Sequence, residues 1–126
     1  MLLDTHALIW FLEGNDRLSH RARNEIEAAG AQVHVSAVSA FEITIKYRSG
    51  KLPNVAALAE NFVRLMRDFG FEDLPISLRH AQAAGLLAIP HKDPFDRLLI
   101  AQAQIEGLTL VSNEAMFDAF AVSRLW

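Results

Sequence analysis

Four acidic residues of this chain lie at joints between short apolar segments and the helical stretches beside them. They are Asp4, Glu42, Asp96 and Glu114. Two carboxylates about 5 Å apart repel by on the order of 3 kcal/mol at an effective dielectric constant of roughly 20. If the four side chains converge, the cluster therefore needs protonation or a bound cation. An all-oxygen ligand set without a thiolate selects a hard ion, so the expected chemistry is binding of Mg²⁺ or Mn²⁺.

The elements that must bring these acids together alternate along the chain. Short apolar segments typical of buried strands cover residues 2–3, 33–35, 74–76, 108–111 and 121–125. Helices are expected over residues 7–12, 19–29, 39–49, 54–69, 77–88 and 94–106, with a short one near Asn113. This alternation predicts a mostly parallel sheet with helices on both faces. Ligands of such sheets bind just beyond the carboxyl ends of the strands, where these acids fall.

Helix capping is the alternative explanation for each acid taken singly. Ser39 and Glu42 have the spacing of a capping box, and Asp93 precedes a proline with Asp96 three residues later. Acids in the first turn of a helix are also favoured by the helix dipole. Glu42 can further pair with Lys46 one turn later as an ordinary surface ion pair. Both explanations stay open for these residues, and Asp93 is best explained as an N-cap.

The composition limits the classes of protein to consider. The 126 residues are 52% hydrophobic and 21% charged, which indicates one folded domain over residues 1–126. No apolar run approaches the roughly 20 residues that span a bilayer, so no membrane segment is expected. The absence of cysteine fits a reducing compartment, and we expect a cytoplasmic protein. A net charge of −3 gives no general attraction to nucleic acid, so a polyanionic partner needs local basic residues or metal ions.

Four segments of the chain, in the same order, resemble the PIN-domain ribonucleases, and among them the VapC-type toxins of bacterial toxin–antitoxin pairs. The segments are LLDTH at 2–6, SAVSAFEI at 36–43, DPFDRLLIAQA at 93–103 and LVSNE at 110–114. The resemblance extends over nearly the whole chain. It implies a single PIN-like domain with a three-layer α/β/α fold around a central, mostly parallel sheet.

The resemblance also implies roles for individual residues. Asp4, Glu42 and Asp96 stand at the three principal acidic positions of the family, and Glu114 stands where the family usually has Asp. These four are the expected catalytic residues and metal ligands, and the longer side chain of Glu114 must reach the metal directly or through water. Possible auxiliary residues are Asp93, Thr5 and Ser112. Thr5 either orients Asp4 through its hydroxyl or caps the helix that follows.

The function implied by the resemblance is Mg²⁺-dependent hydrolysis of RNA phosphodiesters, with Mn²⁺ as a possible substitute. The protein would be the toxin of a type II toxin–antitoxin system, with RNA as substrate, a cognate antitoxin as partner and a homodimeric assembly. One alternative is a catalytically weak PIN-like module that only docks a protein partner. A second is a phosphotransfer or receiver domain, but neither its acceptor Asp in mid-chain nor its lysine after a later strand can be placed convincingly.

Basic residues flank the acidic joints and are expected either to contact RNA phosphates or to lie on ordinary solvated faces. They are Lys46, Arg48, Lys51, Lys92 and Arg97. His6 and His91 are expected near the same edge, and the five histidines lack the spacing of a zinc site. The large apolar residues Trp10, Phe11, Phe62, Met66 and Phe69 are expected in the core or in a groove for a dimer partner or an antitoxin.

Overall fold

The computed structural model describes residues 1–88, 90 and 93–126, and a five-stranded parallel sheet lies at its centre. The sheet has the order β3-β2-β1-β4-β5, and each strand pairs with its neighbours in parallel. Its strands are β1 (Leu2–Leu3), β2 (His34–Ser36), β3 (Glu72–Leu74), β4 (Leu110–Val111) and β5 (Arg124–Leu125). The chain runs outward from β1 to β3 and then returns to β4 on the other side of β1. The carboxyl ends of β1 and β4 therefore form the switch point at which such sheets bind ligands.

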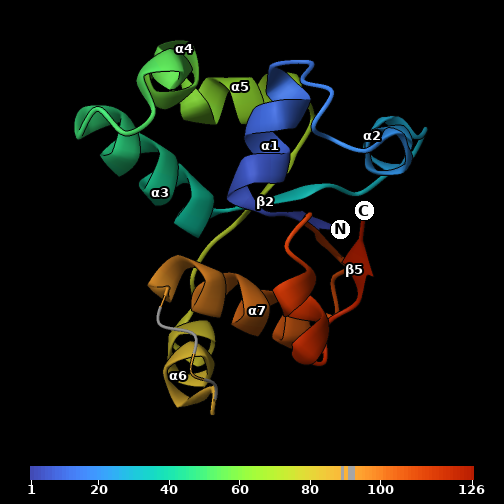
Figure 1. Cartoon of the computed structure of the whole chain (residues 1–126), viewed down its shortest axis with the longest axis vertical. Helices are drawn as coiled ribbons and strands as arrows, with labels where there is room; N and C mark the ends of the chain where they lie inside the picture. Colours follow the sequence, from blue (N-terminus) through green and yellow to red (C-terminus); the bar gives the residue numbers. More distant parts are fainter. Residues whose placement is uncertain (89, 91–92) are drawn as a thin grey trace.

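Helices cover both faces of the sheet. The first group comprises α1 (Thr5–Leu12), α2 (His20–Glu27), α3 (Ala37–Arg48), α4 (Ala56–Glu60) and α5 (Phe62–Asp68). The second comprises α6 (Leu78–Leu86) and α7 (Pro94–Glu106), and two 3-10 turns, η1 (Pro53–Val55) and η2 (Ala115–Ala119), complete the fold. In Figure 1, α1, α3, α4 and α5 lie above the strands while α6 and α7 lie below. The predicted three-layer α/β/α fold is confirmed.

The two faces of the sheet bury separate apolar clusters. Leu3 packs in the cluster with α1, α2 and α5, whereas Leu2 packs in the cluster with α7 and η2. Successive side chains of a strand point to opposite faces of the sheet, and helices cover both faces here. Both leucines are therefore fully buried. A strand that is covered on both faces is apolar throughout. This is why the sequence predicts a strand at residues 2–3 although the segment is so short. Within the described residues, no helix is long and apolar enough to cross a membrane.

Several predicted elements differ from the structure in their bounds. The helix expected over 54–69 is interrupted at Asn61, whose side-chain amide donates to the carbonyl of Ala57, 3.1 Å away. The backbone of Asn61 leaves the helical conformation, with φ of −126° and ψ of 25°, although its N–H still donates to the carbonyl of Ala57 at 3.2 Å. Asparagine has a low helix propensity, so the apolar spacing continues across a break. The strand expected over 74–76 lies two residues earlier, at Glu72–Leu74. It ends before Pro75, which has no N–H to donate to a ladder. The strand expected over 121–125 is confined to β5.

The N-terminus of α3 also differs from the prediction. Ser36 is the N-cap, and its hydroxyl accepts from the backbone N–H of Val38 at 3.0 Å. Ser39 is buried inside the helix, and Glu42 falls in the second turn instead of the first. The expected capping box of Ser39 and Glu42 is therefore wrong. This leaves the Glu42 carboxylate available for contacts across the domain.

Candidate active site

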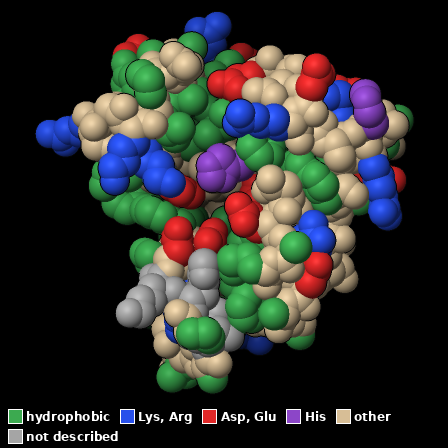
Figure 2. All heavy atoms as spheres, in the orientation of Figure 1, with side chains coloured by type: hydrophobic (Ala, Val, Ile, Leu, Met, Phe, Trp, Pro, Cys, Tyr) green, Lys and Arg blue, Asp and Glu red, His purple; other side chains and the backbone are tan. Residues whose placement is uncertain are grey.

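The four acids predicted from the sequence line one pocket at the switch point of the sheet. Its volume is about 170 Å³, and we call it the acidic pocket. Its described lining is Asp4, Thr5, His6, Glu42, Lys46, Asp93, Asp96, Glu114 and Met116. Figure 2 shows acidic side chains gathered in a hollow near the middle of one face. Among the larger cavities, the two with volumes of about 440 and 370 Å³ are lined mainly by apolar side chains and hold no such set of acids.

Asp4 is both a helix cap and a member of the acidic pocket. Its Oδ1 accepts from the backbone N–H of Ala7 at 2.7 Å, which caps α1. The side chain is only 4% exposed, and this burial raises the pKa of Asp4 to about 6. Hydrogen bonds from Ser112 and Ala7 oppose the increase, while the nearby charge of Asp96 adds to it. A carboxylate in this position is costly unless a cation compensates its charge.

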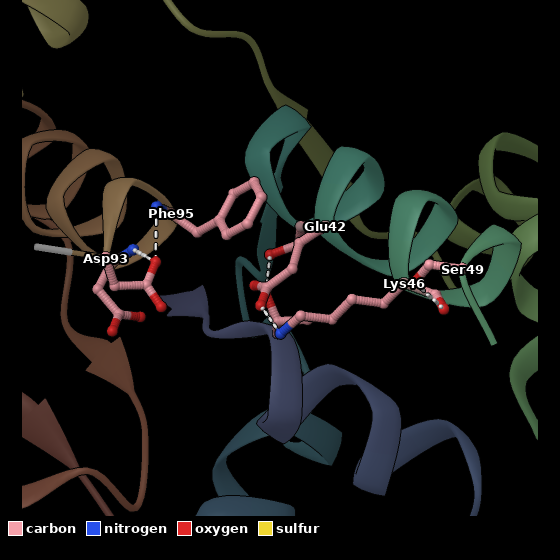
Figure 3. A network of polar contacts seen from close by, with 8 residues as sticks. Glu42, Lys46, Ser49, Asp93 and Phe95 are labelled. Atoms are coloured by element: carbon pink, nitrogen blue, oxygen red, sulfur yellow. Dashed lines mark hydrogen bonds and ion pairs between the residues drawn. The ribbon is translucent and has the colours of Figure 1, made fainter. Parts of the chain in front are cut away.

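Glu42 is held by contacts to both of its carboxylate oxygens. The Thr5 hydroxyl donates to Oε1 at 2.6 Å, and the Lys46 ammonium lies 2.5 Å from Oε2 (Figure 3). Thr5 Oγ1 also lies 3.1 Å from the hydroxyl oxygen of Ser39. The hydroxyl contacts of Thr5 thus orient Glu42 instead of Asp4, and the cap of α1 is Asp4 instead of Thr5. The predicted ion pair of Glu42 and Lys46 exists, but Glu42 is buried, so it is not a surface pair.

The acids of α7 have different surroundings. Asp93 is the N-cap, as predicted, and its Oδ1 accepts from the backbone N–H groups of Phe95 at 2.9 Å and Asp96 at 3.3 Å (Figure 3). Asp96 is half-buried in the first turn and lines the acidic pocket. The ring of Phe95 points from α7 towards α3, where its centroid lies 5.9 Å from that of Phe41. This aromatic contact joins the two helices that carry Glu42 and Asp96.

The segment after β4 supplies the remaining acid. Glu114 is exposed at the start of η2, and its backbone N–H donates to the hydroxyl of Ser112 at 3.0 Å. Ser112 is fully buried and also hydrogen bonds to Asp4. One hydroxyl therefore connects the end of β1 with the turn that carries Glu114.

The donor set of the acidic pocket suits a hard divalent ion, because it is rich in carboxylates and contains no thiolate. The acids are nevertheless not assembled as ligands. In the part of the chain that the structure describes, no three His, Cys, Asp or Glu side chains stand close enough to hold a metal ion. Glu42 is engaged by Thr5 and Lys46, and Asp93 uses Oδ1 as a cap. Binding of an ion in the acidic pocket would therefore require at least one of these side chains to move.

One positioning residue was not singled out from the sequence. Gln102 is fully buried in α7; its Oε1 accepts from the Ser36 hydroxyl at 2.5 Å, and its amide donates to the carbonyl of Pro75 at 3.2 Å. These contacts join α7 to the carboxyl ends of β2 and β3. A polar residue between Ile100 and Ala103 on an otherwise apolar helix face was the available signal.

The basic residues expected to contact phosphates have diverse surroundings. The Arg97 guanidinium donates to the carbonyls of Ala84, Gly85 and Leu87, so it holds the end of α6 against α7. Lys46 lies in the acidic pocket, while Arg48 and Lys51 are exposed beyond it. His6 lines the pocket, as expected for the same edge. His91 and Lys92 lie outside the described residues.

Comparison with known proteins agrees with this architecture. A complex of a toxin and an antitoxin from Klebsiella pneumoniae matches with 21% identity and a TM-score of 0.68, covering 99% of this chain and 95% of that chain. DNA-bound VapBC from Salmonella typhimurium matches with 17% identity and a TM-score of 0.71, covering 98% and 95%. FitAcB from Neisseria gonorrhoeae matches with 19% identity and a TM-score of 0.72, covering 99% and 96%.

These identities establish similarity of fold. No curated protein sequence matches the chain significantly. The family model of the PIN domain matches residues 1–123. Because that match covers almost the entire chain, the protein belongs to the PIN domain family.

Proposed function

We propose that this protein is a metal-dependent endoribonuclease and the toxin of a type II toxin–antitoxin pair. The observation that carries the proposal is the meeting of Asp4, Glu42, Asp96 and Glu114, from separate elements, in one pocket at the switch point of the sheet. Membership of the PIN family and the similarity to a toxin–antitoxin complex support a nuclease toxin. PIN nucleases generally use divalent metal ions, and we infer Mg²⁺, with Mn²⁺ as a substitute, from the all-oxygen donors.

In this proposal the four acids hold one or two ions. Mg²⁺ held by these acids would supply a water of lowered pKa and a positive charge beside the scissile phosphate and the leaving oxygen. The chain's own part is to place the ligands: Thr5 fixes the rotamer of Glu42, and Ser112 fixes that of Asp4. Such supporting hydroxyls are worth about 10- to 100-fold in metal affinity or activity.

The partners belong to the same proposal. The similarity to a toxin–antitoxin complex favours a cognate antitoxin as partner. A homodimer is the assembled form that we infer. The main alternative is a PIN-like module that docks a protein partner without cleaving RNA. The two differ in what the purified protein does to RNA in the presence of Mg²⁺.

RNA cleavage by the purified protein tests the proposal. We expect cleavage with Mg²⁺, none with a chelator, and none with Asp4→Asn or Asp96→Asn while the far-UV circular dichroism stays native. Asp16→Asn removes an exposed acid outside the acidic pocket and is the matched control. Absence of cleavage with any divalent ion, combined with stable binding of an antitoxin, would support the binding module instead.

A further inference from the structure

Lys46 lies among the acids of the pocket. It extends from α3 one turn beyond Glu42, the spacing at which a glutamate and a following lysine attract each other on a helix. The Lys46 side chain is 32% exposed and the Glu42 side chain 7%, so the ion pair is partly shielded from water. Of the described residues that line the acidic pocket, only Lys46 carries a permanent positive charge.

We propose that the Lys46 ammonium is the resident counter-ion of Glu42, and that a divalent ion must displace it before Glu42 becomes a metal ligand. This inference rests on the proposed metal-dependent function. In this role Lys46 is a positioning residue that holds Glu42 in place when no ion is bound. The strength of the ion pair then sets the ion concentration at which Glu42 becomes a ligand.

The arrangement of contacts around Glu42 supports such an exchange. Thr5 donates to Oε1, whereas Lys46 contacts Oε2, so replacement of one cation by another at Oε2 leaves the Thr5 contact in place. A buried carboxylate without any counter-charge would be costly, which explains why the ammonium occupies this position.

Calorimetric titration of the metal-free protein with Mn²⁺ tests the exchange without measuring catalysis. Lys46→Met keeps the length of the side chain and removes the charge, and we expect Mn²⁺ to bind about three- to fivefold more tightly, the upper part of the range for a partly exposed ion pair. Lys46→Arg should stay near the wild-type affinity. Arg48→Met makes the same change of net charge on an exposed position of α3 and should alter the affinity by less than about twofold.

Thermal unfolding gives a second readout. In a chelator, Lys46→Met should unfold at a lower temperature than Arg48→Met, because Glu42 loses its counter-charge, and saturating Mn²⁺ should raise its Tm by more than that of the wild type. Lys46→Gln is the second variant if Lys46→Met does not fold, with the same expected tightening of Mn²⁺ binding.

The outcomes separate this inference from the proposed function. If the wild type binds Mn²⁺ but the Lys46 variants bind it no more tightly than Arg48→Met does, the counter-ion role is wrong while the metal site stands. If neither the wild type nor any variant binds Mn²⁺, the metal-dependent function and the exchange both fail.

Discussion

Thr5 donates its hydroxyl to Oε1 of Glu42 at 2.6 Å, which joins the first turn of α1 to the second turn of α3. Both side chains are buried, and the hydroxyl also contacts Ser39. The contact spans 37 positions of sequence and fixes an acid of the acidic pocket from a neighbouring helix. The threonine that follows Asp4 therefore serves the second acidic segment, not the first.

Replacement of Thr5 by valine tests this role. The variant keeps the shape of the side chain and removes the donor, so we expect metal affinity or RNA cleavage to fall about 10- to 100-fold. The free energy of unfolding should fall by about 1.5–3 kcal/mol, as for loss of a hydrogen bond to a charged group. Thr44→Val is the matched control, because that hydroxyl bonds to the carbonyl of Ala40 within α3. Equal activities of the two variants would contradict the role of Thr5.

The buried carboxylate of Asp4 leads to a prediction about stability. Its pKa is raised from 3.8 to about 6, so the folded protein holds this proton more tightly than the unfolded chain does. The contribution of Asp4 to the free energy of unfolding is fully present below the pKa of the unfolded chain. It is lost as the pH rises through the pKa of the folded protein, about 6. The loss is of the order of 3 kcal/mol, at 1.36 kcal/mol per pKa unit.

We therefore expect Asp4→Asn to stabilise the metal-free protein at pH 8 by about 1–3 kcal/mol, with little difference near pH 4. Asparagine can still cap α1, so the cap contributes little to the comparison. Urea unfolding in a chelator at the two pH values measures the effect, and Asp16→Asn should show no such dependence. A variant less stable than the wild type at pH 8 would show that the carboxylate is compensated by groups already present.

Protonation of the same group should weaken ion binding. A metal ligand must be deprotonated, so a proton on Asp4 competes with the ion below a pH of about 6. We expect the Mn²⁺ dissociation constant to change little between pH 8 and 7 and to rise by about tenfold per pH unit well below 6. Calorimetry across this range is the measurement. A constant affinity down to pH 5 would remove Asp4 from the ligand set.

The parts of the fold that followed from the sequence are those with local signals. The helix over 94–106 was predicted with the bounds of the structure, because Asp93 and Pro94 define its start and Gly107 its end. Gly107 has a φ of +64°, a left-handed conformation that glycine adopts without strain. The convergence of the four acids followed from one rule about parallel strands and not from any single motif.

The parts that did not follow have no distinct signal in the apolar pattern, or depend on tertiary contacts. The apolar spacing across residues 54–69 is continuous and does not indicate that the backbone leaves the helix at Asn61, between α4 and α5. Ser36 and Ser39, near the start of α3, could each serve as its N-cap. The hydrogen bond from Ser36 to the buried Gln102 favours Ser36 in this position. The position of Lys46 inside the acidic pocket likewise depends on the burial of Glu42. That burial cannot be predicted from the sequence pattern around Glu42.

Gln102 provides the last prediction. Its side chain bonds to the Ser36 hydroxyl and to the carbonyls of Leu74 and Pro75, so Gln102→Leu leaves buried polar groups at the ends of β2 and β3 without this partner. We expect the free energy of unfolding to fall by about 2–3 kcal/mol. Gln104→Leu makes the same substitution at an exposed position of α7 and should cost less than about 0.5 kcal/mol. Urea unfolding compares the two. A loss shared equally between them would mean that the leucine itself, and not the buried contacts, destabilises α7.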